Sequence, residues 1–181
     1  MRPPLFTLAA VASSIAALLA GCAACPVTPP EVPAALRAPE GQQVFMQAMA
    51  TGAQIYVCAA KPDDASSFAW VFQAPEATLA DRDGHALGKH YAGPTWESVD
   101  GSSVVGEVKA RDAGPDKAAI PWLLLKAKSS AGQGVLTPTK SVQRVQTHGG
   151  VAPAEACTSA NAQQVMRVPY TAVYYFYRAA P

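Results

Sequence analysis

Histidine and charged residues are scarce in this sequence. Only 3 of its 181 residues are histidines, and Asp, Glu, Lys and Arg together make up 15% of the chain. Lys and Arg number 14 against 13 Asp and Glu, without a block of either sign. A nucleic-acid-binding domain carries a basic patch or stripe, so we expect no nucleic-acid partner.

Several motifs that carry chemistry are missing as well. The sequence contains no G-x-S-x-G nucleophile elbow and no S-x-x-K pair. No G-x-G-x-x-G follows a strand pattern, and the glycines of a phosphate-binding loop are absent. We therefore predict no catalytic residue, no metal ion and no cofactor, and we favour a role other than that of an enzyme.

One apolar run, from Leu5 to Ala20, stands out near the start of the chain. It is shorter than the about 20 residues that span a bilayer. It follows Arg2 and ends in small residues, which is typical of a secretory signal. The closing Leu19-Ala20-Gly21-Cys22 resembles the lipobox of bacterial lipoproteins, whose cysteine is acylated after cleavage. The resemblance implies a signal peptide over residues 1–21 and a lipid, palmitate included, on Cys22.

The same resemblance predicts a location. Ala23 follows the cysteine at the position where an aspartate retains lipoproteins in the inner membrane. An outer-membrane lipoprotein that faces the periplasm is therefore favoured. Because two or more acyl chains anchor a protein stably, we expect the membrane to be a partner through the lipid anchor.

Prolines are concentrated directly after this cysteine, at five positions between residues 26 and 39. Proline removes a backbone donor and disfavours both helices and sheet ladders. We expect residues 22–41 to form an extended tether and residues 42–181 to form a single domain.

Within residues 42–181, short segments rich in β-branched and aromatic residues recur between turn residues. Asp81-Arg82-Asp83-Gly84 and Asp100-Gly101 are typical of tight turns, and we expect a further turn at Thr51-Gly52. The apolar run 120–126 predicts a strand buried on both faces. This pattern predicts an all-β fold, an antiparallel β-sandwich or a barrel-like single domain. The expected strands are 44–46, 54–58, 68–72, 89–91, 95–99, 103–110, 120–126, 142–147 and 168–177.

Four cysteines fit an exported chain. With Cys22 acylated, the expected disulfide joins Cys58, in a strand-like segment, to Cys157, in the loop before the last strand. A bond from Cys25 to either partner is the alternative.

Several short sequence motifs occur together, in a fixed order, over residues 42–178. They resemble those of an uncharacterised family of secreted bacterial and fungal proteins, classed as a domain of unknown function. The resemblance implies export and a single domain, and it supplies no activity, ligand or catalytic residue. The motifs are GAQIYVC (52–58), GKHYAGPTWE (88–97), DGS (100–102), IPWLLL (120–125), QRVQTHGG (143–150) and the Tyr-rich segment at the end of the chain.

Aromatic and polar residues mark a candidate ligand surface. Flat rings that face outward from a strand can stack on sugars or apolar ligands, while neighbouring polar groups fix the orientation. The expected ligand is an envelope glycan or a small apolar molecule. The residues expected to line this surface are His90, Tyr91, Trp96, Glu97 and Arg144.

Two functions remain open from the sequence. The favoured one is a lipid-anchored binding or structural module of the cell envelope without catalytic activity. The alternative is an exported metal-dependent or acid/base hydrolase that uses His90, Glu97 and His148, because two histidines and a carboxylate form a ligand set suited to zinc.

Overall fold

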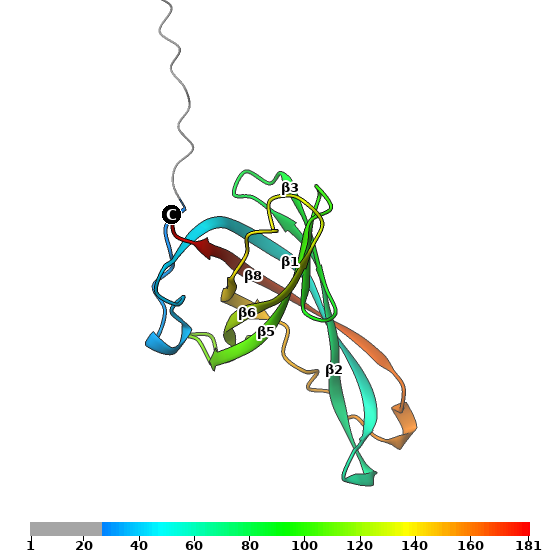
Figure 1. The fold of residues 1–181 in the computed structure, drawn as a ribbon. Coiled ribbons are helices and arrows are strands. Elements are labelled where there is room, and N and C mark those ends of the chain that lie inside the picture. The colour runs from blue at the N-terminus through cyan, green and yellow to red at the C-terminus, as the bar shows by residue number, and fades with distance from the viewer. Residues whose placement is uncertain (1–26) are drawn as a thin grey trace, which may run out of the picture.

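The computed structural model describes residues 27–181 (Figure 1). The predicted signal peptide, the predicted lipidation of Cys22, and Cys25 lie outside these residues. No helix in the described part is long and apolar enough to cross a membrane. The helical elements are the short 3-10 turns η1 (Ala34–Leu36) and η2 (Ser159–Asn161). The strands are β1 (Gln42–Lys61), β2 (Asp64–Ala80), β3 (Ala86–Tyr91), β4 (Thr95–Ser98), β5 (Ser103–Asp112), β6 (Trp122–Ala131), β7 (Ser141–Gly149) and β8 (Val165–Ala179).

Each strand pairs antiparallel with the next one along the chain, and β8 returns to pair with β1. The sheet therefore closes into a ring. The prediction of an all-β, antiparallel single domain is confirmed, and the barrel-like arrangement is observed rather than the sandwich. The ring is not a regular barrel, because the pairing shifts at bulges, for example between Ile55 and Tyr56 and between Val145 and His148.

Three strands extend past the ring. β1, β2 and β8 have 20, 17 and 15 residues, and their outer parts form an arm at the lower right of Figure 1. The prediction of a turn at Thr51-Gly52 is wrong, since β1 runs through these two residues without a break. A Cβ atom on Gly52 would lie 2.1 Å from the backbone oxygen of Glu76. This glycine therefore permits a close approach of β1 and β2, and it does not make a turn.

The disulfide predicted from the sequence is present on this arm. Cys58 of β1 is bonded to Cys157, and their Cα atoms lie 5.5 Å apart. The backbone N–H of Cys58 also donates to the oxygen of Gln164, and the N–H of Gln163 donates to the oxygen of Cys58. The loop that carries η2 is thereby fixed to the arm.

Alternate side chains of each strand fill the inside of the ring, as the period of two in a β-strand requires. On β8, Tyr174 and Phe176 belong to the interior core, whereas Tyr175 belongs to a cluster on the outer face. Trp96 packs edge-to-face on both Tyr174 and Phe176. β6 follows the same alternation: Leu125 is buried inside, whereas Trp122 is partly exposed. The expectation that residues 120–126 are buried on both faces is therefore wrong.

Residues 27–41 lie against the outside of the ring. Val27 and Val32 pack on the outer cluster of β7 and β8, and Leu36 of η1 is fully buried. The side-chain amide of Gln143 donates to the backbone oxygen of Leu36. The sequence predicted an extended tether over residues 22–41, whereas the described part of it packs on the ring. Proline prevents sheet pairing, but it does not prevent the apolar residues between the prolines from being buried.

Candidate functional site

The inside of the ring contains a cavity of about 490 Å³. This volume is within the range of small-molecule sites in proteins. The mouth of the cavity is formed by exposed residues at the base of the arm and on the neighbouring loops, and its walls are almost fully buried. Phe72, Gln73, Gly93 and Arg111 lie at the mouth, and Gln54, Tyr56, His90, Trp96, Leu125 and Tyr174 form the walls.

The register of the sheet brings the polar wall residues together. His90 of β3 pairs directly with Trp96 of β4, and Arg144 of β7 pairs directly with Tyr174 of β8. Residues that lie opposite each other on neighbouring strands share a face of the sheet. All four side chains therefore point into the ring and line the cavity.

His90 is neutral inside this cavity. Its ring stacks on that of Trp96 with 4.6 Å between the centroids, and its Nδ1 lies 2.8 Å from the backbone oxygen of Thr95. Because a carbonyl oxygen only accepts, Nδ1 carries the proton and Nε2 is left as an acceptor. Burial, above all, and the charge of Arg144 together lower the pKa of His90 to about 4, against the opposing effect of the hydrogen bond to Thr95.

Four buried polar atoms around the cavity form no hydrogen bond of normal geometry among residues 27–181, although the Tyr170 and Tyr174 hydroxyls lie close enough for each to shift the pKa of the other. They belong to residues that are at most 2% exposed. An unpartnered buried group costs about 1–3 kcal/mol, and such groups are uncommon enough in native proteins to need an explanation. The four atoms are Gln54 Nε2, Trp96 Nε1, the Tyr170 hydroxyl and the Tyr174 hydroxyl.

Arg144 gives the cavity a positive charge. Its Nε and Nη2 donate to the backbone oxygen of Pro121, at 3.2 and 2.8 Å. In the described part of the chain, Arg144 forms no ion pair, and the lining of the cavity includes no Asp or Glu. Burial raises the pKa of the Tyr170 and Tyr174 hydroxyls, and the guanidinium acts against that rise. Its field therefore reaches the cavity walls.

The structure separates the five predicted ligand residues into two groups. His90, Trp96 and Arg144 meet at the cavity. Tyr91 and Glu97 lie on the outer face of β3 and β4, where the Tyr91 hydroxyl donates to Glu97 at 2.7 Å and Lys89 pairs with Glu97 at 3.1 Å. Neighbouring residues of a strand point to opposite faces, so these two side chains do not reach the interior.

The three residues of the hydrolase alternative do not converge. His90 faces the cavity, and Glu97 lies on the opposite face of the sheet. The side chain of His148 is 73% exposed, and its Nδ1 lies 3.6 Å from Asp116. No shared ligand site is formed by these side chains.

Sequence reasoning missed several residues of the cavity, among them Gln54, Tyr56, Arg111 and Tyr174. A glutamine in an otherwise apolar strand was the one available signal for Gln54. The others look like ordinary strand or loop residues, and only the closure of β8 on β1 shows which way their side chains point.

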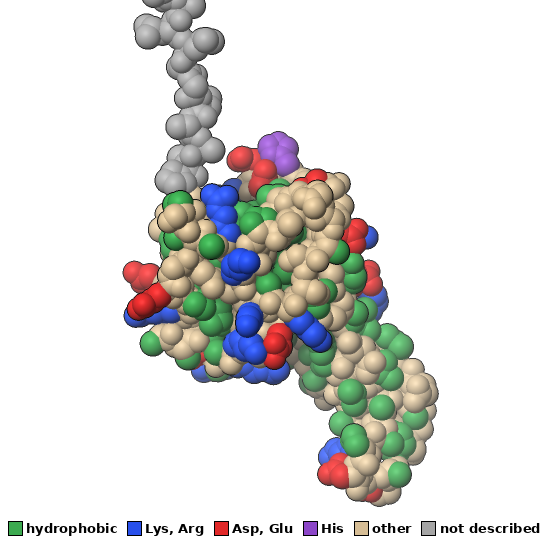
Figure 2. Space-filling view, in the orientation of Figure 1, with side chains coloured by type: hydrophobic (Ala, Val, Ile, Leu, Met, Phe, Trp, Pro, Cys, Tyr) green, Lys and Arg blue, Asp and Glu red, His purple; other side chains and the backbone are tan. Residues whose placement is uncertain are grey.

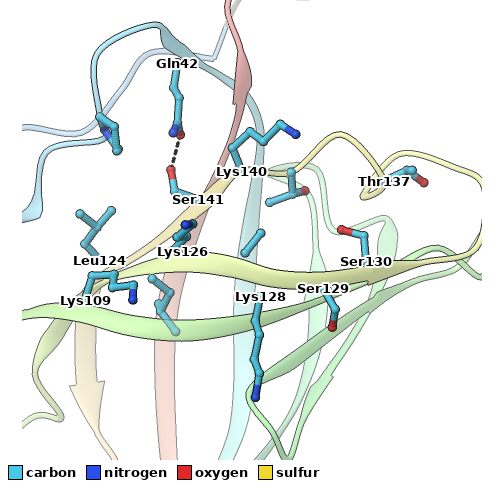
Figure 3. Close-up of a pocket in the computed structure, with 14 residues that line it drawn as sticks. Gln42, Lys109, Leu124, Lys126, Lys128, Ser129, Ser130, Thr137, Lys140 and Ser141 are labelled. Carbon is cyan, nitrogen blue, oxygen red and sulfur yellow. Dashed lines mark hydrogen bonds between the residues drawn. The ribbon is translucent and has the colours of Figure 1, made fainter.

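A larger groove of about 660 Å³ lies beside β5 and β6 (Figure 3). Basic side chains gather over these strands in Figure 2. The buried hydroxyls that line the groove already form hydrogen bonds, since Thr139 donates to Leu136 and Ser141 donates to Gln42. None of the unpartnered buried polar atoms found among the described residues belongs to a residue that lines the groove, so the groove is a weaker candidate for a ligand site than the cavity. The lysines that line the groove are Lys109, Lys126, Lys128 and Lys140.

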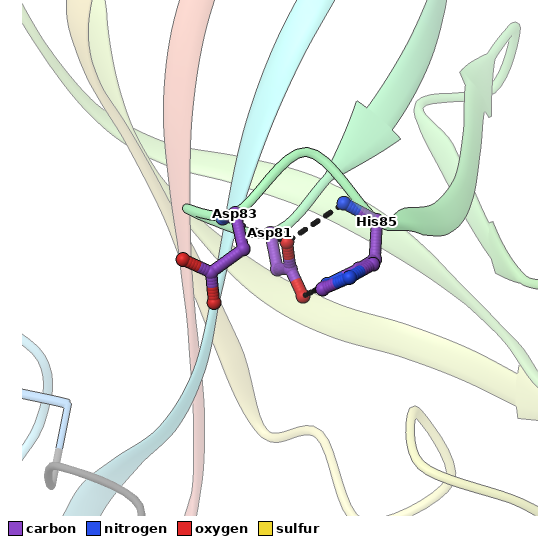
Figure 4. A group of neighbouring side chains, drawn as sticks. All are labelled: Asp81, Asp83 and His85. Atoms are coloured by element: carbon purple, nitrogen blue, oxygen red, sulfur yellow. Dashed lines mark hydrogen bonds and ion pairs between the residues drawn. The ribbon is translucent and has the colours of Figure 1, made fainter.

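Asp81, Asp83 and His85 form a cluster of metal-ligand type on the β2–β3 turn (Figure 4). Asp81 accepts hydrogen bonds from the backbone N–H groups of Asp83 and His85, and it pairs with Nδ1 of His85 at 2.9 Å. This pairing lowers the pKa of Asp81 and raises that of His85. The carboxylate is thus occupied in closing the turn, which accounts for the cluster without a metal.

The fold and the cavity define a class of protein: a closed, eight-stranded antiparallel ring with a small-molecule-sized cavity inside. A ring of eight strands has an interior that side chains fill or that holds one small ligand. The family described as "Protein of unknown function (DUF3455)" matches residues 39–178, and the chain belongs to this family. Neither the curated proteins nor the solved structures include a match to the chain.

Proposed function

We propose that this protein is a binding module of the bacterial cell envelope that holds a small, largely apolar ligand inside the ring and does not transform it. In this proposal Cys22 is acylated after export, and the domain faces the periplasm from the outer membrane. The lipobox-like end of the leader and the Cys58–Cys157 disulfide support export.

One observation carries the proposal: a cavity whose walls leave buried polar atoms unpartnered. A solvent-accessible cavity of this size, apolar with a few inward-facing polar groups, is the usual form of a ligand site. An envelope glycan fits less well, because the Trp96 ring that the sequence offered for stacking is 1% exposed.

The test uses the neutral fluorophore N-phenyl-1-naphthylamine with the exported chain carrying Cys22→Ser, which removes the acylation site. We expect saturable binding to one site and energy transfer from Trp96, reduced in Trp96→Phe. Val108 of β5 also lines the cavity, so Val108→Trp narrows the cavity and should abolish binding. Ser130→Trp, in the lysine-lined groove, is the matched control and should leave it unchanged. The reverse pattern would move the site to the groove.

The lipid anchor has a test of its own. We expect the wild-type chain to be found in the outer-membrane fraction, with a mature N-terminus at Cys22 and the added mass of the acyl chains. Cys22→Ser should lack that mass and leave the membrane fraction. Wild-type protein with an unmodified Cys22 would refute this part of the proposal.

A further inference from the structure

The cavity combines an unpaired positive charge with an excess of hydrogen-bond donors. Arg144 is half-buried and, among the residues described, has no carboxylate partner. A second cation, Arg111, lies at the mouth. Removing a charge from water without a counter-ion is costly, and this cost would fall if a ligand supplied the missing charge.

The geometry of Arg144 leaves part of its guanidinium free. The backbone oxygen of Pro121 takes hydrogen bonds from Nε and Nη2. A guanidinium has five N–H donors, so the donors of Nη1 and one of Nη2 remain. Its edge is planar and matches the two oxygens of a carboxylate or related anion. The bond to Pro121 also fixes the direction of this edge before a ligand arrives.

The unpartnered atoms need acceptors. Gln54 Nε2 and Trp96 Nε1 can only donate, and the hydroxyls of Tyr170 and Tyr174 can do so. An anionic group with two or three oxygens offers several lone pairs to such donors. A cationic ligand would meet Arg144 without any acidic side chain in the lining, and a hydrocarbon would offer these donors no acceptor.

We propose that the ligand is a small amphipathic anion whose carboxylate-like group is bound by Arg144 inside the ring while its apolar body lies against Trp96 and Leu125. This inference rests on the proposed function, since it names the chemistry of the ligand held in the same cavity. The residues that would receive the charged group are Gln54, Trp96, Arg144 and Tyr174, all of which line the cavity.

A matched pair of probes tests it. 1-Anilinonaphthalene-8-sulfonate is N-phenyl-1-naphthylamine with a sulfonate added, so the two differ by the anionic group. We expect the wild-type chain to bind the sulfonate at least about tenfold more tightly than the neutral probe. Arg144→Gln should remove this preference, because it should weaken binding of the sulfonate far more than binding of the neutral probe. Arg144→Lys keeps the positive charge but lacks the planar guanidinium edge, so it should retain part of the preference for the sulfonate.

Two further variants keep the result interpretable. Gln54→Met removes one donor and should weaken sulfonate binding even if Arg144→Gln fails to fold, which circular dichroism would show. Lys126→Gln, in the lysine-lined groove, should have no effect. If the sulfonate instead loses affinity in Lys126→Gln and not in Arg144→Gln, the anion site is the groove and the inference is overturned.

The outcomes also separate the two proposals. If neither probe binds, the proposed function fails. If both bind with equal affinity, the cavity binds apolar molecules, and the inference of an anionic ligand is wrong. If the preference for the sulfonate disappears in Arg144→Gln, both are supported.

Discussion

At the scale of single residues, the buried polar groups of the cavity make stability depend on pH. His90 has a folded-state pKa of about 4, against 6.5 for an unperturbed histidine. The unfolded chain therefore takes up this proton at a higher pH than the folded chain does. A neutral imidazole is the form that the interior tolerates.

We predict that the free energy of unfolding falls as the pH is lowered from about 6.5 to about 4, by about 3 kcal/mol in total from His90. Above about pH 6.5 this contribution is fully present, and below about pH 4 it is fully lost. Urea unfolding at pH 7, 5.5 and 4.5 measures the slope. Asp100, whose hydrogen bonds lower its pKa to about 2, affects stability mainly below this window.

The control for this prediction is the exposed His85. Its pKa is raised by Asp81, so its contribution has the opposite sign and is lost as the pH rises. His90→Gln should flatten the dependence between pH 6.5 and 4.5, and His85→Gln should not. An equal slope in wild type and His90→Gln would contradict the assignment.

A second prediction concerns the hydroxyl of Tyr174, which is buried without a partner. Tyr174→Phe removes the unpartnered oxygen and keeps the ring, so we expect a gain of about 1 kcal/mol or more in unfolding free energy. Tyr177→Phe is the matched control. Its hydroxyl donates to Gln143, and its removal should cost about 1 kcal/mol. Chemical denaturation of both variants checks the signs, and two losses would refute the view that Tyr174 is held for a ligand.

At the scale of elements, the close approach of β1 and β2 depends on a glycine. In Gly52→Ala the new Cβ would meet backbone atoms of Glu76 and Ala77 at 2.1 and 2.5 Å. These atoms belong to a paired strand and cannot turn aside as a flexible side chain does. We predict a loss of about 1–3 kcal/mol, measured as a lower denaturation midpoint. An unchanged midpoint would show that the paired backbones of β1 and β2 move apart at little cost to make room for the methyl group.

Local sequence signals predicted much of this sheet. Strand patterns and the turns at 81–84 and 100–101 depend on neighbouring residues, and they were found near the expected positions, although the strands expected at 44–46 and 54–58 are parts of the single strand β1. Gly52 was misread because glycine marks turns and close contacts alike. The outer face of β6 was misread because an apolar run does not show which of its residues a distant segment will cover.

The candidate site was predictable in part. His90 and Trp96 share a face, but the sequence-based set also included their neighbours Tyr91 and Glu97, which the period of a strand places on the other side. Arg144 reaches the same cavity through pairing of β7 with β8 and of β8 with β1. The pairing of β8 with β1 joins residues more than a hundred positions apart, and no local pattern specifies it.

At the scale of the whole molecule, the folded domain begins before the family boundary at residue 39. Leu36 of η1 is fully buried, and η1 lies against β5 and β6. Leu36→Ala should therefore cost about 2–5 kcal/mol. Glu31→Ala, at an exposed position of the same segment, should change stability by less than about 0.5 kcal/mol. Thermal unfolding distinguishes the two, and equal midpoints for both variants would mean that the segment is not part of the domain.

The packed N-terminal segment also limits how far an anchored protein can reach. In the proposed lipid-anchored form, five peptide steps join Cys22 to Val27, which already packs on the ring. Fully extended, they span at most about 18 Å. The domain would then diffuse in the plane of the membrane and exchange ligand only with donors near the bilayer surface. The arm extends from the ring on the side away from the blue N-terminal segment (Figure 1), and in the proposed anchored form it would be the part that reaches furthest into the periplasm.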